Sequence, residues 1–583
     1  MPRSVTIFCI LFIISYVNVS SLKAQPVINS FSPESGVIGT TVIIKGRNFN
    51  PIASKNIVYF GSVRASVSNA TSSTLSVSVP PSATYQPITV MSNGLTASSI
   101  VPFLVTFTGG DSMFSQTSFS PETFISGGSC NGEMALCDFD GDGKPDIAYI
   151  NGCASGLSVS KNTTVDSLIS FEAVVNIPKD NYPIGIAVGD FDGDGKKDIV
   201  TANFNGNSVS VYQNKSSVGL ISFDPGKDYA AGTNTYGVAV ADLNADGKPD
   251  IIATNEYDHP GSISVFINTS TKGILSFTTQ QIFNVGYSPR RLIVFNANND
   301  NKPDLAVANQ GSGSVSILVN SSTKNIISFE NREFAVTPGS SPESISCGDL
   351  NADGKQDLIV ANNNQKGTIS ILKNASTKAN FSFALMDLPA MNYPYATVIT
   401  DLNGDGKPDI AAISHYMSNS AFVYNNKSKN GKISFALPVN YTTTTQHEDI
   451  SAADLNNDNK PDILFGNYMS GALVGVLLNK QNLALPVNSY NFSNLESGIL
   501  DDKLSVNIYP VPVSNILNIK GLDASVRNYL EIINTNGDVV AKQTVQNNSF
   551  YEWNLDNLRK GVYYLLVNTG IKRISIKFEK NTP

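Results

Sequence analysis

Seven short segments with closely spaced aspartates are the residues of this sequence best suited to chemistry. The first reads DFDGDGKPD from Asp138, and the others repeat its pattern of acidic or amide side chains at positions one, three, five and nine. Alternating carboxylates on a tight turn bring their oxygens together, and Ca²⁺ takes six to eight oxygen ligands. The segments therefore predict calcium-binding loops, in which the lysine at position seven contributes its backbone carbonyl.

Six of these segments carry enough carboxylate and amide groups to be assigned as metal sites. Their predicted ligands are Asp138, Asp140, Asp142, Lys144, Asp146, Asp190, Asp192, Asp194, Lys196, Asp198, Asp242, Asn244, Asp246, Lys248, Asp250, Asp349, Asn351, Asp353, Lys355, Asp357, Asp401, Asn403, Asp405, Lys407, Asp409, Asp454, Asn456, Asp458, Lys460 and Asp462. Together the seven segments hold 22 of the chain's 48 acidic residues, a concentration that is strongly repulsive without a cation. Solvated acidic turns are the alternative. Because an enclosed Ca²⁺ leaves no position open for a reaction, the metals are expected to be structural.

The fourth segment departs from the pattern. It has Asn296, Asn298, Asp300 and Asp304 at the ligand positions, and Asn301 where most of the others have glycine. Asparagine tolerates a left-handed backbone better than most residues, so the turn is expected to survive. Two carboxylates attract Ca²⁺ less than four, so this loop is expected to bind most weakly or to stay empty.

The acidic segments recur every 52 to 54 residues, which identifies a repeat. An asparagine follows each loop by 24 to 26 residues and ends an alternating apolar run that is typical of a half-buried strand. These residues are Asn162, Asn214, Asn268, Asn320, Asn374, Asn426 and Asn479. Several precede x-Ser/Thr, as in glycosylation sites, but a repeated polar turn is the favoured interpretation.

A Ser-Phe pair marks the phase of the repeat. The first pair, at Phe119, precedes the first acidic loop, and no pair follows the last loop. The final unit therefore needs strands from both ends of the repeat region, roughly 462–479 and 113–125. A ring closed in this way hides the sheet edges that an open array would expose.

The repeated Dx[DN]xDGxxD motif resembles the FG-GAP (VCBS) repeats, and the resemblance covers about 112–480. It implies a seven-bladed β-propeller of four-stranded blades, with the calcium loops between the first two strands of each blade on one face. Residues 25–107 resemble an IPT/TIG immunoglobulin-like domain, through PVINSFSPESGVIGTTVIIKGRNF and the later VYFG and PITV. Such domains usually act as spacers or interaction modules.

After a polar linker at 481–500, residues 501–583 resemble the C-terminal sorting domain of the type IX secretion system of Bacteroidetes-type bacteria. The matching segments are SVNIYPVPVSNILNIKG and KGVYYLLVNTG, in which YPVP replaces the usual YPNP. An ordinary β-sandwich is the alternative. The expected fold class is all-β throughout, with the sorting domain as a β-sandwich.

The N-terminus predicts export. Arg3, the apolar stretch Ile7 to Val17 and small residues up to Ala24 are typical of a signal peptide, assigned to 1–24. A transmembrane anchor is the alternative, but the apolar stretch is shorter than the roughly 20 residues that a span needs. We expect a secreted or outer-membrane surface-attached protein that engages the type IX machinery and has no transmembrane segment. The net charge of −8 and the lack of a Lys/Arg cluster argue against nucleic-acid binding.

No catalytic constellation stands out. The three histidines, His259, His415 and His447, belong to different repeats, and no hydrolase, zinc or nucleotide motif is present. We therefore expect a non-catalytic, monomeric binding or adhesion protein for an extracellular protein or glycan. A secreted hydrolase or lyase, with its site on the face opposite the calcium loops, is the alternative.

Two smaller expectations concern tyrosines and cysteines. Tyrosines recur before the loops, near the calcium-free face; packing near the central channel is favoured over a ligand platform for Tyr182, Tyr236, Tyr287, Tyr393 and Tyr395. Cys130 and Cys153 flank the first two strands of one blade, and a disulfide between them is predicted in an oxidising compartment. Cys137 and Cys347 are expected to pack as small apolar residues.

Overall fold

The computed structural model describes residues 24–580 except 109–112, 126–130, 152–155, 166–168, 173–174, 180, 378–380, 416–418, 444–445, 468–473, 482–506, 510–515, 523, 525–527, 535–538, 547 and 569–572. The signal-peptide prediction, the Cys130–Cys153 disulfide and most of the linker therefore lie outside the described residues. The chain divides into two units, Met1–Pro486 and Val487–Pro583, and each is described by itself.

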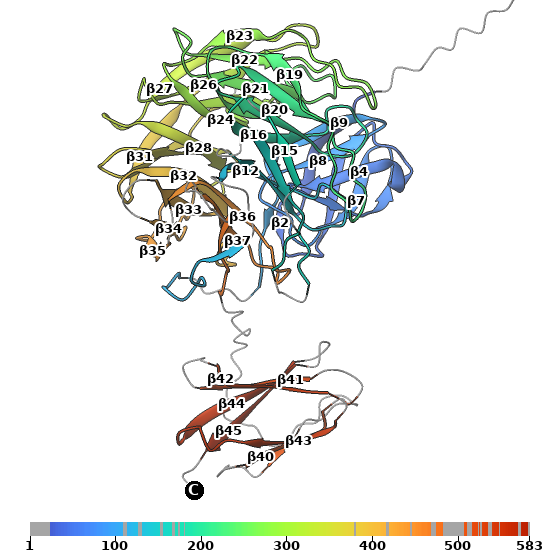
Figure 1. The fold of residues 1–583 in the computed structure, drawn as a ribbon, viewed down its shortest axis with the longest axis vertical. Coiled ribbons are helices and arrows are strands. Elements are labelled where there is room, and N and C mark those ends of the chain that lie inside the picture. Colours follow the sequence, from blue (N-terminus) through green and yellow to red (C-terminus); the bar gives the residue numbers. More distant parts are fainter. Residues whose placement is uncertain are drawn as a thin grey trace, which may run out of the picture. The chain divides into compact units, whose positions relative to one another are not determined.

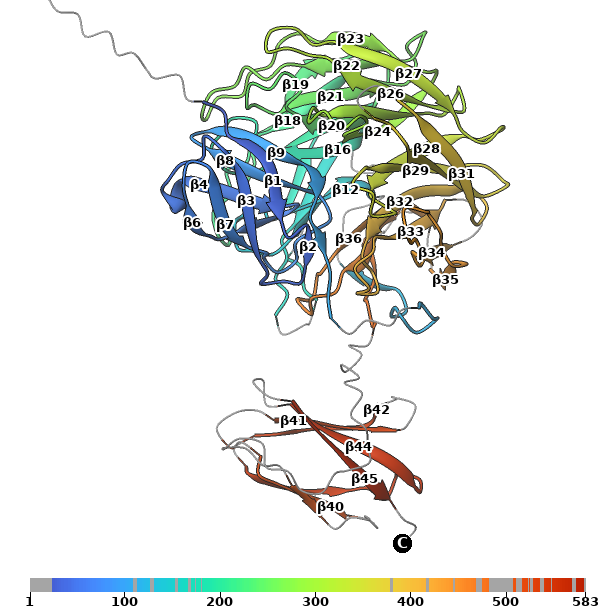
Figure 2. The same cartoon turned by 180° about the vertical axis from the view of Figure 1, so that it is seen from behind.

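The N-terminal domain is a sandwich of two four-stranded sheets (Figures 1 and 2). Its strands are β1 (Val27–Ser32), β2 (Ser35–Gly36), β3 (Thr41–Arg47), β4 (Asn56–Phe60), β5 (Val63–Ala65), β6 (Val67–Ala70), β7 (Thr74–Ser78), β8 (Pro87–Ser92), β9 (Leu95–Pro102) and β10 (Leu104–Val105), with a 3-10 turn at Ala53–Lys55. The sheet orders are β1-β3-β7-β6 and β5-β4-β8-β9, and β10 pairs with β2. Side chains alternate between core and solvent along β3 and β7. Ile44 and Leu75 from these strands are buried in the core together with Phe103, which follows β9.

Six sheets of four consecutive antiparallel strands follow along the chain. They are β12–β15 (Asn131–Cys137, Asp146–Asn151, Gly156–Ser160, Val175–Pro178), β16–β19 (Pro183–Gly189, Asp198–Asn203, Ser208–Tyr212, Lys227–Ala230), β20–β23 (Thr235–Ala241, Asp250–Asn255, Ser262–Phe266, Gln281–Asn284), β24–β27 (Pro289–Phe295, Asp304–Asn309, Ser314–Asn320, Phe329–Ala335), β28–β31 (Pro342–Gly348, Asp357–Asn362, Thr368–Asn374, Phe383–Pro389) and β32–β35 (Pro394–Thr400, Asp409–Ser414, Ser420–Tyr424, Val439–Thr442). The second strands are buried along their whole length because neighbouring sheets cover both of their faces.

The seventh blade closes the ring. It contains β36 (His447–Ala453), β37 (Asp462–Asn467) and β38 (Val474–Leu477), and its outer strand is β11 (Thr123–Ile125) from the other end of the repeat region. Phe119 also forms a bridge with Asn479, as the other Phe and Asn markers do within their own blades. The first strands contact their neighbours around the whole ring, including β36 with β12. The closure expected from the offset Ser-Phe pairs is confirmed.

The C-terminal unit is a smaller β-sandwich. Its strands are β39 (Asn507–Tyr509), β40 (Ile516–Lys520), β41 (Asn528–Asn534), β42 (Val539–Val545), β43 (Phe550–Asn554), β44 (Gly561–Asn568) and β45 (Arg573–Lys580). They form sheets in the orders β39-β40-β43 and β42-β41-β44-β45 around a core that includes Trp553, Leu565 and Phe578. The chain is thus all-β, as predicted. Within the described residues no helix is long and apolar enough to cross a membrane.

Candidate calcium loops and the opposite face

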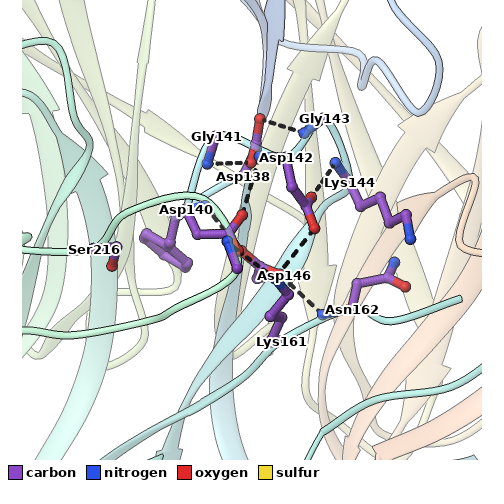
Figure 3. A network of polar contacts seen from close by, with 12 residues as sticks. Asp138, Asp140, Gly141, Asp142, Gly143, Lys144, Asp146, Lys161, Asn162 and Ser216 are labelled. Carbon is purple, nitrogen blue, oxygen red and sulfur yellow. Dashed lines mark hydrogen bonds and ion pairs between the residues drawn. The ribbon is translucent and has the colours of Figure 1, made fainter.

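The first acidic loop folds around its own carboxylates (Figure 3). Asp138 accepts hydrogen bonds from the backbone N–H of Gly141 at 2.8 Å and of Gly143 at 3.1 Å, and Asp140 accepts one from Asp142 at 3.0 Å. Both glycines have positive φ, which L side chains rarely adopt. The left-handed turn is what bends the chain back and brings the alternating carboxylates to one side.

The fourth loop keeps this turn without glycine. Asn299 and Asn301 have φ of 60° and 72°, and Asn459 in the seventh loop has 69°. Asparagine is tolerated in this region, so the backbone of the loop survives the substitution, as predicted.

The aspartate at position nine anchors each loop to the third strand of its blade. Asp146 accepts hydrogen bonds from the backbone N–H of Phe139 and of Asn162, both at 2.9 Å. The equivalent pair of bonds occurs at Asp198, Asp250, Asp304, Asp357, Asp409 and Asp462. This structural role was not foreseen from the sequence. Each oxygen retains a lone pair, so it is compatible with metal ligation.

Two loops bring three carboxylates within reach of a single cation. Oxygens of Asp138, Asp140 and Asp146 lie within 4.8 Å of one another, as do those of Asp190, Asp192 and Asp194. These are the first two loops, which carry the most acidic residues. An all-oxygen donor set of this kind fits a hard cation such as Ca²⁺.

Burial makes the charged state of these carboxylates costly. Burial raises the pKa of Asp138 to about 6 and that of Asp146 to about 8. The backbone hydrogen bonds that these carboxylates accept act in the opposite direction and lower the pKa. Burial, with the nearby charges of Asp194 and Asp192 acting in the same direction, raises the pKa of Asp190 to about 7. A bound divalent cation reverses this balance because it favours the ionised form.

The first two loops differ in one residue that sequence reasoning missed. Lys161, at the end of the third strand, places Nζ 2.5 Å from Asp140 Oδ2 and 3.4 Å from Asp142 Oδ2 (Figure 3). In the second blade the corresponding residue is the uncharged Gln213, which donates to Asp192 Oδ2 at 2.5 Å. An ammonium group therefore contacts Asp140 in the first loop, whereas a neutral amide contacts the equivalent Asp192 in the second, where Lys197 acts instead on Asp190. The sequence shows this difference at the residue directly before each repeated asparagine, which is Lys161 before Asn162 and Gln213 before Asn214.

The repeated asparagines join neighbouring blades. Asn214 is fully buried, and its Nδ2 donates at 2.9 Å both to the carbonyl of Phe139 in the preceding blade and to that of Lys197. Its Oδ1 accepts from the N–H of Ser216. The equivalents from Asn268 to Asn479 make the same cross-blade bonds. These contacts support the interpretation as a polar turn rather than a glycosylation site.

The N-terminal domain covers the loop face of the propeller. Gln25 Nε2 donates to Asp242 Oδ2 at 2.6 Å, and Thr106 Oγ1 donates to Asp401 Oδ2 at 2.5 Å. Further hydrogen bonds reach the first, second and seventh loops: Asp138 N to the Ser62 carbonyl (3.0 Å), Tyr59 OH to the Gly195 carbonyl (3.1 Å) and Ser82 Oγ to the Asp454 carbonyl (2.6 Å). The domain is therefore more than a spacer, because it contacts the acidic loops directly.

A cleft of about 560 Å³ remains between this domain and the second and third loops. Asp190, Asp192 and Asp194 line it on the propeller side, and Lys55 and Met91 line it on the other. The carboxylates of the second loop therefore border this cleft, although Asp190 and Asp192 are themselves buried.

The opposite end of the axis carries a charged network that the sequence did not reveal. Arg291 on β24 lies 2.7 Å from Asp449 on β36 and 3.3 Å from Glu133 on β12. These residues come from blades four, seven and one, so the ion pairs cross the axis of the ring. Burial raises the pKa of Glu133 to about 7, and the charge of Arg291 opposes this rise.

A second group lies beside it. Arg290 forms an ion pair with Glu256 at 3.0 Å, and its guanidinium lies 4.4 Å from the centre of the Tyr236 ring. Tyr236 donates to Glu343 at 3.1 Å and its hydroxyl lies 3.5 Å from that of Tyr395. Both tyrosines are buried. Packing at the channel is thus the correct interpretation for these two tyrosines, and wrong for Tyr182 and Tyr287, which are exposed.

Two of the three histidines also lie at this end of the propeller, close enough for the charge of His415 to act on His447. His415 stacks on Tyr395 with ring centroids 4.6 Å apart, and its Nε2 lies 3.6 Å from Glu448 Oε1. His447 is fully buried, and its Nδ1 lies 2.6 Å from Asn467 Oδ1. Burial lowers the pKa of His447 to about 4. The sequence did not indicate that the two histidines lie close together, because they occupy different positions of the repeat. His415 follows the second strand of the sixth blade, and His447 begins the first strand of the seventh.

Family comparisons agree with this architecture. The FG-GAP-like repeat matches residues 138–201, 190–253, 242–307, 296–360, 349–412 and 401–465. The IPT/TIG domain matches 26–128, a range that extends past β10 and includes β11 of the propeller, and the secretion system C-terminal sorting domain matches 507–581. No curated protein matches the chain.

Similar solved structures are distant. BBS1N in complex with ARL6DN is 13% identical with a TM-score of 0.41, and the alignment covers 63% of this chain and 99% of that one. An auxiliary nutrient binding protein from Bacteroides thetaiotaomicron is 14% identical (78% and 97% covered, TM-score 0.32), and a rhamnogalacturonan lyase from Bacillus licheniformis is 12% identical (79% and 90%, 0.36). The sorting domain indicates export through the type IX system, to the medium or the cell surface. The chain belongs to the FG-GAP-like repeat family, as a propeller with an N-terminal IPT/TIG domain and a C-terminal sorting domain.

Proposed function

We propose that this exported protein is a monomeric, calcium-stabilised propeller that binds an extracellular protein or glycan and catalyses no reaction. The observation that carries the calcium part is the pair of three-carboxylate groups in the first two loops, whose oxygens lie within 4.8 Å of one another. Calcium would be held by Asp138, Asp140 and Asp146, and by Asp190, Asp192 and Asp194. It would supply the positive charge that offsets the repulsion among buried carboxylates.

The assignment of the ligand to the opposite face rests on coverage of the loop face. Gln25, Tyr59 and Thr106 of the IPT/TIG domain bond to three of the loops, which leaves the calcium-free face as the broad surface for a partner. The charged groups near the axis there are engaged with one another, as Arg291 is with Asp449 and Glu133. Structural ion-pair networks also perturb the pKa of their members, so the raised pKa of Glu133 does not by itself require a catalytic role.

The test uses the mature chain from Gln25 onward. Calorimetric titration should show calcium binding, and immobilised glycans and extracellular proteins should show retention of the protein without any change in the ligand. The rival hydrolase or lyase is favoured by one observation, the position of His415 beside Glu448. Release of reducing ends or unsaturated products from polysaccharides, lost in His415→Ala, would support the rival and contradict the proposal.

A further inference from the structure

Three tyrosines on consecutive blades are unusually exposed. Tyr182, Tyr257 and Tyr287 have 41%, 49% and 45% of their surface accessible, whereas Tyr236 and Tyr395 on the same face have 8% each. The buried pair stands six residues before its acidic loops, whereas Tyr182 and Tyr287 stand eight and nine residues before theirs, so the exposed rings occupy different positions of the repeat. Scattered apolar residues on a surface need no explanation, but a group of them does.

The chain topology places all three on the calcium-free face. Tyr182 directly precedes the first strand β16, and Tyr287 stands two residues before the first strand β24. Tyr257 stands two residues after the second strand β21. Since each acidic loop joins the end of a first strand to the start of a second one, these positions lie at the other end of the blades. The IPT/TIG domain, which binds the loops, leaves this end uncovered at the exposed tyrosines.

Ring contacts connect the exposed side chains. Phe204, which is half-buried, donates its N–H to the carbonyl of Tyr182 at 3.0 Å, and its ring lies 6.2 Å from that of Tyr257. His259 stacks on Tyr287 with centroids 5.3 Å apart and planes 17° from parallel. We define these five residues, Tyr182, Phe204, Tyr257, His259 and Tyr287, as the aromatic strip. It runs across blades two, three and four.

The backbone at one end of the strip is held in an unfavourable region. Tyr182 has φ of 53°, which is uncommon for a residue with a bulky side chain. The same positive φ occurs directly before the first strand of the third and sixth blades, at Asn234 (54°) and Tyr393 (58°), so it is a feature of the repeated turn. At the corresponding position of the fourth blade, Ser288 has the same φ of 53° with a small side chain. The turn therefore does not itself require a tyrosine.

Polar groups border the strip. Asn181 Nδ2 donates to Asp228 Oδ2 at 3.1 Å, and Asp258 accepts the N–H of Thr233 at 3.0 Å. Tyrosine combines a flat apolar ring with a hydroxyl at its edge. Sugars present the same combination, with C–H groups on the face of the ring and hydroxyls around it, so exposed tyrosines with carboxylates and amides beside them match a sugar.

We propose that the aromatic strip binds the sugar rings of an extracellular glycan. This inference rests on the proposed function, because it identifies the ligand class and the position of the site on the calcium-free face. The rings of Tyr257 and Tyr287 stack on sugar faces, and side chains at the border, such as Asp258, accept hydrogen bonds from hydroxyls. A protein ligand is the competing outcome.

The experiment compares Tyr257→Ala and Tyr287→Ala with Tyr529→Ala, which removes a ring of similar exposure, 46%, from the sorting domain. Each mature full-length variant is applied to an array of immobilised neutral and acidic oligosaccharides, and the strongest glycan found for the unmodified chain is then titrated. Both strip variants should bind at least tenfold more weakly, Tyr529→Ala should bind normally, and Tyr257→Trp should retain binding.

A folding control and three contrary outcomes make the test decisive. The calcium-dependent rise in melting temperature should be the same in all variants. Glycan binding that survives both strip substitutions, or retention of proteins alone, would overturn the aromatic strip as a glycan site and leave the proposed binding function intact. Absence of any ligand, with calcium binding retained, would contradict both.

Discussion

The hydroxyl of Thr106, just beyond the last strand of the IPT/TIG domain, donates a hydrogen bond of 2.5 Å to Oδ2 of Asp401 in the sixth acidic loop. Asp401 is fully buried, so this bond joins two domains at a charged atom removed from water. Gln25, two residues before the first strand of the same domain, donates a similar bond to Asp242 at 2.6 Å. The two ends of the IPT/TIG domain are therefore both attached to loop carboxylates, and the domain and the loops are expected to unfold together.

Replacing Thr106 with valine should weaken this attachment. Valine keeps the shape and removes the donor, and loss of a hydrogen bond to a charged group costs about 1.5–3 kcal/mol. The free energy of unfolding of the IPT/TIG–propeller unit should fall by that amount in urea titrations. Thr71→Val, at an exposed turn within the domain, is the control. An unchanged free energy in Thr106→Val would mean that the domain is not held through this contact.

Lys161 should lower the calcium affinity of the first loop. Its Nζ lies 2.5 Å from Asp140 Oδ2. The ammonium group therefore already neutralises a carboxylate charge that would otherwise attract the metal. Lys161→Gln should therefore strengthen calcium binding at that loop about tenfold, which corresponds to about 1.4 kcal/mol. The matched substitution Gln213→Lys should weaken the second loop. Calorimetric titration of both variants measures the change, and an opposite or absent effect in this pair would remove Lys161 from the account.

Much of the fold could be predicted because the repeat encodes it within each blade. The acidic loop, the asparagine and the Ser-Phe pair recur with constant spacing, and their hydrogen bonds are local to one blade or to the next. The closing strand followed from the offset of Phe119 alone. Near-constant spacing thus determines the blade number and the closure without knowledge of any side-chain contact.

The remaining features could not be predicted because they depend on residues that occur once. Arg291, Glu133 and Asp449 each stand five residues before the start of their acidic loop, so the repeat places them at one level of the axis, but the residue type at this position differs from blade to blade. The docking of Gln25 and Thr106 on the loops likewise depends on the orientation of a separate domain. The repeat indicates the level of such residues along the axis, but which of them pair across the ring, and how the separate domain docks, depend on the tertiary structure.

Acid should destabilise the propeller through His447. Burial lowers the pKa of this imidazole to about 4, and its Nδ1 contacts Asn467. Glu122, 3.9 Å from Nε2, favours protonation, and His415 opposes it. Because the folded pKa lies below the unfolded value of about 6.5, this stability is present above pH 6.5 and is lost as the pH falls towards 4, by up to about 3 kcal/mol.

The substitution His447→Gln isolates this effect. Glutamine does not titrate, so the free energy of unfolding of the variant should lose that part of its pH dependence between pH 6.5 and 4. His259→Gln, at an exposed position, is the control and should follow the unmodified chain. Identical pH profiles for His447→Gln and the unmodified chain would show that protonation of His447 is not linked to unfolding.

Removal of residues 501–583 should block delivery without affecting the propeller. These residues contain the matched sorting domain, and the C-terminal unit is separate from the propeller unit. In cell fractionation the truncated chain should remain inside the outer membrane, while its calcium-dependent melting should equal that of the full chain. Unchanged delivery to the surface or medium would contradict the assignment of the sorting domain.

The most direct measurement for the account as a whole is the melting temperature of the mature chain with calcium and with a chelator. Metal that binds only the folded state stabilises it by mass action, so chelation should lower the melting temperature and added Ca²⁺ should restore it. Asp142→Ala should reduce this calcium-dependent gain more than Asp300→Ala, because the first loop carries four carboxylates and the fourth carries two. Equal effects of the two substitutions, or a melting temperature that does not respond to chelator, would contradict the central claim that these loops hold the propeller through calcium.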